Sequence, residues 1–466
     1  MKRHASLALC AVSLLSGCSV GPKYARPTVP VPDAFYAEEQ LAEARSLADV
    51  AWWDVFGDPV LTGLVEEALR NGFDVREAAA RVEEARARYG IARSEFFPSD
   101  AYQVAWQRAR ADPTVDPLGT TQSRWIADVG FSWELDLWGR IRRLNESALG
   151  HYLATEEGRR GVLLSLAADV AAAYLDLREL EAELEIANRT TAAFQETYNL
   201  FRRRLEGGAA SALETARAEA TLNEVAAEIP EIERAIVSTE NRINFLLGRN
   251  PQPIPRPATP QRLPSEVPPG LPSSLLERRP DIRQAEQILV AANANVGVAK
   301  AAFFPRLSLT GLFGSVSPDL GSLFSDGNTW SIGAGLLGPL FQGGRIKRGH
   351  EAAVAQWEQA RVQYEAAVAN AFVEVSNALV DRSKLAQTEM LRAQAVAAHL
   401  EAVRLANLRY ASGLSAYFEV LEAQQELFPA ELDLARTRRD QLVAMVDLYR
   451  ALGGGWPAED RASREP

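Results

Sequence analysis

The sequence predicts a mainly α-helical chain with four β-strands, each apolar on one face, arranged as two copies of one repeat. Three observations support this fold class. Residues of the first half recur in the second half at nearly constant spacing. Two very long stretches, about 140–206 and 345–412, contain no proline. Four shorter segments alternate apolar and polar residues, as strands do. Each repeat therefore runs helix, strand, strand, long helix and a further helix.

Composition excludes several classes of protein. The 466 residues carry 50 Lys and Arg against 61 Asp and Glu, a net charge of −11, which argues against a nucleic-acid binder. The only two cysteines, Cys10 and Cys18, lie at the N-terminus and cannot build a disulfide framework. The four histidines form no pair with metal-ligand spacing. We therefore expect no metal and no cofactor.

The chain shows no signature of an enzyme. There is no P-loop, no dinucleotide fingerprint and no Gly-x-Ser-x-Gly motif. Asp54, Asp58 and Asp74 have no partner motif, so helix capping or a solvated surface explains them better than catalysis. We expect a protein without catalytic activity.

The first residues resemble a bacterial lipoprotein signal. Lys2 and Arg3 precede a mostly apolar run over 5–15, too short to span a membrane. It ends in Leu15-Ser16-Gly17-Cys18, which resembles a lipobox. The resemblance implies cleavage before Cys18, an S-diacylglycerol group on its thiol and an N-palmitoyl group on the new amine. The alternative is an ordinary signal peptide with an incidental cysteine. Ser19, rather than Asp, favours the outer membrane, and no other segment is apolar enough for a transmembrane helix.

The internal repeat sets the domain organisation. Ten residues between Asp74 and Pro98 recur 207 positions later, between Asp281 and Pro305, and later matches are offset by 205. Nine prolines over 250–272 exclude a helix there and predict an extended linker. The predicted organisation comprises a signal peptide 1–17, an extended lipid-anchored segment 18–58, a first repeat 59–249, the linker 250–272, a second repeat 273–456 and a tail 457–466.

Helices account for most of both repeats. The first helix of each repeat is expected at about 59–95 and 280–302. The long helices would each reach on the order of 100 Å at 1.5 Å per residue. A coiled-coil seam with alternating spacings of three and four residues runs along the first long helix. It consists of Leu163, Leu166, Val170, Ala173, Leu177, Leu180, Leu184 and Ala187.

The strands are expected at about 100–111, 124–137, 306–316 and 328–338, with exposed loops between the members of each pair. Their alternation and the tryptophans near their ends are typical of a transmembrane barrel wall. A half-buried sheet of a soluble domain gives the same alternation, so this alternative stays open. Four strands cannot close a barrel, and lipid tolerates no open sheet edge. Two chains would pool eight strands and three chains twelve, enough for a water-filled lumen.

Taken together, these features resemble the TolC family of outer-membrane factors, in particular the lipoprotein subgroup that serves resistance-nodulation-division efflux pumps. The resemblance covers essentially the whole mature chain. It rests on an ordered set of short motifs: Cys18 with 21–24, Trp52-Trp53 with 56–59, then 96–98, 133–140, 277–281, 301–305, 343–345 and 451–456. It implies a homotrimer with a shared twelve-stranded barrel and a long periplasmic α-helical tunnel. It also implies passive export, with a periplasmic adaptor and an inner-membrane pump as partners.

The resemblance also implies a gate at the periplasmic end of the tunnel. Glu419 and Glu422 lie one turn apart and match the family's acidic gate positions, where a trimer would form two carboxylate rings. Tyr410 matches an aromatic of the gate lock, and Glu214 is the first-repeat counterpart of Glu419. Ser415 stands where the best-known member has a locking arginine, so that salt bridge is absent. From the residues alone, a solvated acidic helix face is the competing interpretation.

The sequence therefore predicts the exit duct of an efflux pump. The alternative is a lipid-anchored periplasmic coiled-coil scaffold or adaptor without a pore, which would need no strands with an apolar, tryptophan-flanked face.

Overall fold

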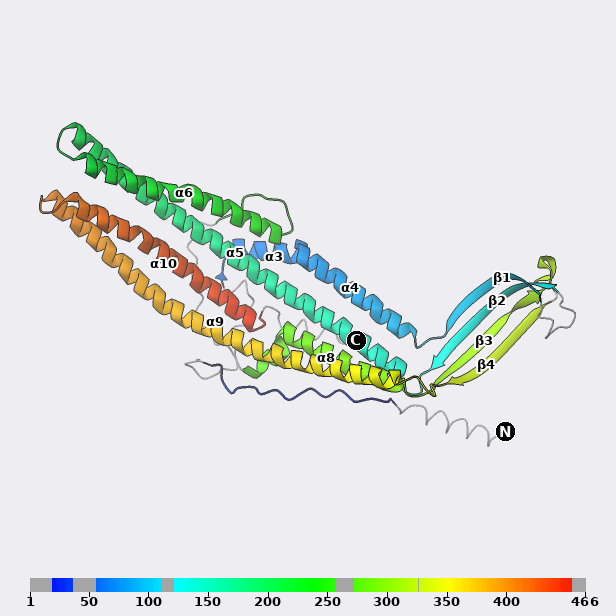
Figure 1. The fold of residues 1–466 in the computed structure, drawn as a ribbon. Helices are drawn as coiled ribbons and strands as arrows, with labels where there is room; N and C mark the ends of the chain where they lie inside the picture. Colours follow the sequence, from blue (N-terminus) through cyan, green and yellow to red (C-terminus); the bar gives the residue numbers. More distant parts are fainter. Residues whose placement is uncertain (1–18, 37–55, 111–120, 257–271, 326, 455–466) are drawn as a thin grey trace. The chain divides into compact units, whose positions relative to one another are not determined.

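The computed structural model describes residues 19–36, 56–110, 121–256, 272–325 and 327–454 (Figure 1). The fold is mainly α with one four-stranded sheet, as the sequence predicted. Two compact units account for the chain. The first holds 81–156 and 284–365 with the N-terminal residues up to 28, and the second holds 29–80, 157–283 and 366–466. None of the described helices contains a stretch that is both apolar and long enough to cross a membrane.

The two repeats place the same elements at the same offsets. Helix α4 spans Phe73–Ser94 and α8 spans Pro280–Ala301, 22 residues each. The long helices α5 (Arg140–Glu206) and α9 (Arg345–Ala411) have 67 residues each. Helices α6 (Ala212–Leu246) and α10 (Tyr417–Ala451) have 35 each. The internal repeat of the sequence is therefore a repeat of structure.

The first helix of the first repeat is interrupted, contrary to the single helix expected over about 59–95. Helix α3 spans Pro59–Asn71 and α4 starts at Phe73, with Gly72 between them in an extended conformation. A Cβ at Gly72 would lie 2.9 Å from Leu166 and 3.1 Å from the carbonyl oxygen of Leu246. The close approach of these neighbours requires glycine, and the chain breaks the helix there.

Asp58 stabilises the start of α3. Its Oδ1 accepts hydrogen bonds from the backbone N–H groups of Val60 (2.8 Å) and Leu61 (3.2 Å), and its Oδ2 accepts one from the Tyr174 hydroxyl at 3.0 Å. Asp58 is thus a buried helix cap, one of the two roles that the sequence analysis favoured for it.

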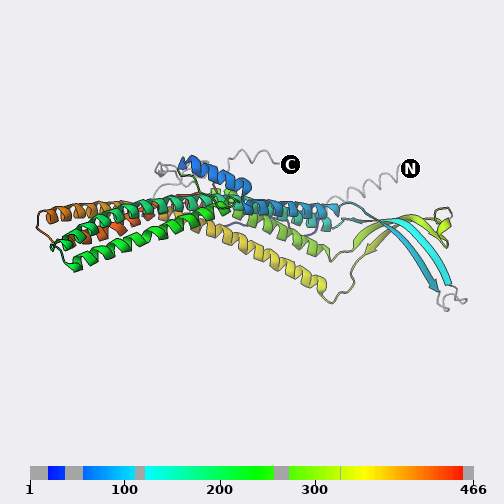
Figure 2. The same cartoon turned by 90° about the horizontal axis from the view of Figure 1, so that it is seen from above.

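The sheet lies in the first unit and has the strand order β1-β2-β3-β4, with all neighbours antiparallel (Figures 1 and 2). The strands span Ser99–Arg110, Thr121–Leu135, Arg306–Ser317 and Asn328–Leu337. β1 and β4 are the two edges, and neither has a second partner strand among the residues that the structure describes.

The register places apolar residues opposite apolar residues. Val129 lies between Tyr102 on β1 and Phe313 on β3, and Phe313 is in turn opposite Trp330 on β4. The Phe131 ring covers Gly311, where a Cβ would approach to 2.0 Å of that ring. One face of the sheet is therefore apolar across all four strands, and much of it is exposed in the single chain.

The junction between β2 and α5 explains one of the sequence motifs. The Asp136 carboxylate accepts hydrogen bonds from the backbone N–H groups of Ile141 (3.0 Å) and Arg142 (2.9 Å) and so caps α5. Gly139 adopts a φ of 79°, which turns the strand into the helix. Arg140 pairs with Glu134 at 2.8 Å. Residues 133–140 are thus a strand-to-helix connector.

Packing along α5 follows the predicted seam. Leu163, Leu166, Val170, Ala173, Leu177 and Ala187 are buried, with Val170, Ala173 and Leu177 at 0% exposure, whereas Leu180 and Leu184 are half-buried. Small residues at these positions allow neighbouring helices to approach closely.

The first described residues lie as a strap along the first unit. The Tyr24 hydroxyl donates to Glu286 at 3.0 Å, and Arg26 forms a bidentate ion pair with the same carboxylate. Gly21 faces Gly297, where a Cβ on Gly21 would come within 2.6 Å of the Gly297 Cα. The strap thus fits closely against helix α8.

Candidate channel gate

Two matching turns, both in the second unit, join the long helices to the helices that follow them. In each turn a glycine adopts the left-handed conformation, Gly208 with φ 72° and Gly413 with φ 74°. Such a residue ends a helix because it lets the next backbone N–H groups return to the last carbonyl oxygens. Figure 1 shows the α5–α6 and α9–α10 hairpins with these turns at their ends.

Glu214 takes part in a helix cap at the first turn. Its carboxylate accepts hydrogen bonds from the backbone N–H and the hydroxyl of Ser211, and the Ser211 Oγ accepts one from the Glu214 backbone N–H. The bond from the Ser211 backbone N–H, reinforced by its hydroxyl, lowers the pKa of Glu214. This geometry explains Glu214 without any role in a gate.

Glu419 and Glu422 lie in the first turns of α10 and are exposed. Glu419 forms an ion pair with Arg409 near the end of α9 at 3.3 Å, across the turn. Glu422 has no hydrogen bond or ion pair among the described residues. The two carboxylates therefore differ, since only one has a counter-charge beside it.

Tyr410 contacts the other hairpin. Arg204, near the end of α5, donates a hydrogen bond to the Tyr410 hydroxyl, and its guanidinium carbon lies 5.4 Å from the centre of the Tyr410 ring. This combines a hydrogen bond with a cation–π contact. The contact joins the end of α5 to the end of α9.

A second aromatic residue strengthens this connection. Tyr417, the first residue of α10, packs edge-on against Tyr410 at 5.0 Å and against Phe201 at 4.6 Å between ring centres. Its hydroxyl is 2.7 Å from that of Thr197. Burial raises the pKa of Tyr417. The start of α10 is thereby held against α5.

Packing continues below these aromatics. A small core of Phe194, Leu222, Val225 and Leu421 joins α5, α6 and α10, and Gln425 donates a hydrogen bond to Thr221 at 2.9 Å. The two hairpins are therefore bound to each other by apolar contacts as well as polar ones.

Ser415 lies between Gly413 and α10, at the position where the best-known member of the family that the sequence resembles has a locking arginine. Its Oγ is buried and has no hydrogen-bond partner among the residues the structure describes. Ser415 makes no polar lock, and the polar contacts between the hairpins at this level come from Arg204 with Tyr410 and from Thr197 with Tyr417.

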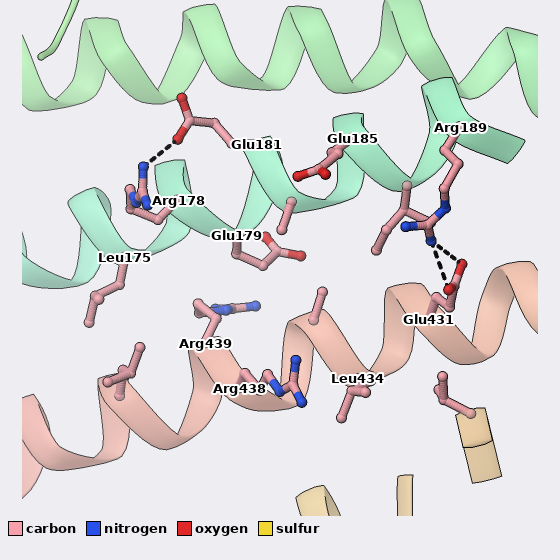
Figure 3. Close-up of a pocket in the computed structure, with 15 residues that line it drawn as sticks. Leu175, Arg178, Glu179, Glu181, Glu185, Arg189, Glu431, Leu434, Arg438 and Arg439 are labelled. Carbon is pink, nitrogen blue, oxygen red and sulfur yellow. Dashed lines mark hydrogen bonds and ion pairs between the residues drawn. The ribbon is translucent and has the colours of Figure 1, made fainter. Parts of the chain in front are cut away.

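A cavity of about 690 Å³ lies between α5 and α10 (Figure 3). Figure 3 shows acidic and basic side chains facing each other across it, including Glu179, Arg189 and Arg439. Glu179 is 8% exposed, and its nearest cation is Arg436, with Nε at 4.0 Å. Burial, together with Glu183 one turn away, raises the pKa of Glu179 to about 8.

Cys18, the proposed lipid attachment, and Asp54 lie outside the described residues. Within the described parts of the chain, no cluster of three His, Cys, Asp or Glu side chains could hold a metal ion.

Arg204, Arg409 and Tyr417 were not predicted from the sequence as gate residues. The only sequence signal was their clustering near the two helix ends. Arg204 and Tyr417 have partners more than 200 residues away, which spacing alone cannot pair, and Arg409 meets Glu419 only because the turn between α9 and α10 brings them together.

Comparison with known proteins gives a consistent result. A family model described as outer membrane efflux protein matches residues 64–249 and 271–454. The probable efflux pump outer membrane protein TtgC of Pseudomonas putida is 37% identical over 463 residues, covering 97% of this chain and 95% of that protein. OprJ of Pseudomonas aeruginosa, an outer membrane protein, is 35% identical over 96% of this chain and 95% of its own length.

Solved structures show the same fold. The outer-membrane channel OprN superposes with a TM-score of 0.87 at 32% identity, covering 94% of this chain and 100% of that one. The open state of the MtrE outer membrane channel of Neisseria gonorrhoeae gives a TM-score of 0.84 at 34% identity, with 94% and 98% coverage.

Proposed function

The chain belongs to the outer membrane efflux protein family, and from this premise we propose how it works: three copies close one channel, which conducts passively what a periplasmic adaptor and an inner-membrane pump deliver. The chain is an outer-membrane efflux channel. The homotrimer, the partners, the lipid on Cys18 and the absence of any catalytic step are parts of the proposal.

The observation that carries the trimer is the pair of open sheet edges. In the described part of the chain, β1 and β4 each lack a partner strand on one side, and the apolar face extends across all four strands. Unpaired backbone groups cannot face lipid, so β1 of one copy has to pair with β4 of the next. Twelve strands enclose a lumen that side chains do not fill.

We assign the closed state to the contacts between the two hairpins. Arg204 and Tyr410 join α5 to α9, while Tyr417 holds the start of α10 against α5. In this proposal the channel opens when the α9–α10 hairpin leaves α5, and the contacts of Arg204 and Tyr417 break. Glu422, and Glu419 when Arg409 releases it, then line the opening.

The test combines three measurements on the purified full-length protein. Chemical cross-linking should give products that end at three chains, and planar bilayers should show discrete conductance steps. In a strain that lacks its own channel, expression should restore efflux only when the adaptor and pump are also present. Products that end at two chains, or a protein without conductance, would support the scaffold alternative.

The contact between Arg204 and Tyr410, which we call the lock, can be tested separately by substitution. Arg204→Gln and Tyr410→Phe should each raise the fraction of time the channel spends open. Arg203→Gln, a neighbour on the same helix, is the matched control. If both lock variants conduct like wild type, Arg204 and Tyr410 do not hold the closed state.

A further inference from the structure

Two arginines extend the apolar face of the sheet beyond its aromatic residues. Trp106 on β1 is paired with Trp125 on β2, and their rings lie 6.4 Å apart on the apolar face. Arg108 and Arg110 follow on the same strand at two-residue steps, so they lie on that same face. Both are exposed. This face therefore changes from aromatic to basic toward the β1–β2 hairpin loop.

The spacing places these arginines at a definite depth. From Leu135 to Trp125, β2 extends ten residues, about 34 Å along the strand. At the tilt of barrel strands this gives an apolar height of about 25 Å, which matches a membrane's apolar band. Arg108 and Arg110 then lie roughly 5–10 Å further out, above the aromatic residues and level with lipid headgroups.

The surroundings favour an anion. Arg108 is opposite Ser123, and Arg110 is opposite Thr121, so each arginine has a small hydroxyl residue as its cross-strand neighbour. Around Arg108, the described strand residues of this face, from Tyr102 onward on β1 and along β2, include no carboxylate. The neighbouring charges Arg124 and Asp128 lie on the opposite face, where Arg124 is bound to Gln107 at 2.9 Å.

We propose that Arg108 and Arg110, with Thr121 and Ser123, form a site for the phosphate groups of a lipid in the outer leaflet of the outer membrane. Guanidinium groups bind phosphate through paired N–H donors, and the hydroxyls can donate further hydrogen bonds. The barrel would carry this site once in each copy, above the aromatic residues. The inference rests on the proposed orientation, with the strand hairpins toward the outside.

The test uses the purified full-length trimer in mild detergent. Its dissociation into single chains on heating is followed while lipid A with both phosphates, or lipid A stripped of phosphate, is added. We expect phosphorylated lipid A to raise the dissociation temperature, and the stripped lipid to raise it much less. In R108Q/R110Q, half-saturation should need roughly thirtyfold more phosphorylated lipid A. Arg124→Gln, at the same height on the lumen face, is the matched control and should respond like wild type.

Each other result decides against the site. An equal response of R108Q/R110Q and wild type would overturn the inference, as would an equal loss in Arg124→Gln. Inorganic phosphate alone producing the whole shift would show a site for free anions rather than for lipid. Conductance is recorded on the same samples. If conductance is normal and the lipid effect is absent, only this inference fails; if wild type conducts nothing, the proposed function fails as well.

Discussion

Glu214 and Ser211 close a capping box at the start of α6, with the Glu214 carboxylate 2.8 Å from the Ser211 backbone nitrogen and 2.9 Å from its hydroxyl. In the second repeat Ala416 stands at the N-cap of α10 and offers no side-chain hydrogen bond. Glu419, the counterpart of Glu214, lies instead 3.3 Å from Arg409. The repeat has thus kept two glutamates at equivalent positions while their contacts have diverged.

Ser211→Ala should weaken the start of α6 by about 1 kcal/mol, because it removes the oxygen that accepts from the Glu214 backbone N–H. The lowered pKa of Glu214 means that its carboxylate stabilises the cap above the ordinary carboxyl range, and that this contribution is lost as pH falls through the lowered value. Amide hydrogen exchange in the first turn of α6 measures both effects. Ser412→Ala is the control, since the Ser412 hydroxyl bonds the Leu408 carbonyl within α9; equal protection in the two variants would contradict the cap.

Glu179 should make the stability of the helices fall with rising pH. Burial beside Glu183 raises its pKa from 4.5 to about 8, so the folded chain holds a proton that the unfolded chain has released. Stability contributed by the protonated form is present below about pH 4.5 and is lost as pH rises toward 8. Glu179→Gln keeps the size and removes the charge, so its melting temperature should exceed that of wild type by a margin that grows from pH 5 to pH 8.

Glu185→Gln is the control for this effect, because Glu185 lines the same cavity and is exposed. Parallel melting profiles for wild type and Glu179→Gln between pH 5 and pH 8 would show that Glu179 is ionised when folded, paired with Arg436 or Arg439 across the cavity.

Glu286 should hold the N-terminal strap. Its carboxylate accepts hydrogen bonds from both Tyr24 and Arg26. Burial, together with the nearby Glu286 carboxylate, raises the pKa of the Tyr24 hydroxyl. Glu286→Ala removes both contacts at once, so trypsin should cut after Lys23 several times faster than in wild type. Glu351→Ala, which removes pairings with Lys347 and Arg348 within α9 and none with the strap, should leave the rate unchanged. No difference between the two variants would mean that the backbone and the glycine contacts hold the strap alone.

Periodic burial explains which parts of the fold the sequence could predict. The alternation of the strands and the seam of α5 are local patterns that can be read from neighbouring residues. Because the chain is duplicated, the strand pairs and the long helices occur in both repeats. The break at Gly72 was missed because it is imposed by Leu166 and the Leu246 carbonyl, which only the tertiary fold brings there. In the gate, resemblance supplied Tyr410, Glu419 and Glu422. Their partners Arg204 and Arg409 emerged only once the helix ends were placed in space.

The two faces of β2 should respond oppositely to charge. Phe131 lies on the apolar face near its middle, and Ser132 lies on the other. Phe131→Arg should cost about 2–4 kcal/mol in the membrane and abolish most trimer assembly. Ser132→Arg should assemble normally. The yield of trimer extracted from outer membranes compares the two directly, and equal yields, or a lower yield for Ser132→Arg, would reverse the assignment of the faces.

The acidic ring at the gate should depend on Glu422 more than on Glu419. Around a threefold axis each position would contribute three carboxylates, which concentrate cations at the constriction. Arg409 offsets Glu419 at 3.3 Å, whereas Glu422 has no counter-charge among the described residues. Glu422→Gln should therefore lower cation selectivity and weaken block by a trivalent cation added on the periplasmic side more than Glu419→Gln does.

Arg409→Gln should strengthen both the cation selectivity and the block, because it leaves Glu419 unpaired. The trimers should survive, since the carboxylates repel one another rather than hold the bundle together. Planar-bilayer recordings of the three variants and wild type decide the matter: unchanged block in Glu422→Gln would return both glutamates to the solvated surface, and a larger loss in Glu419→Gln would show that Arg409 does not neutralise it in the channel.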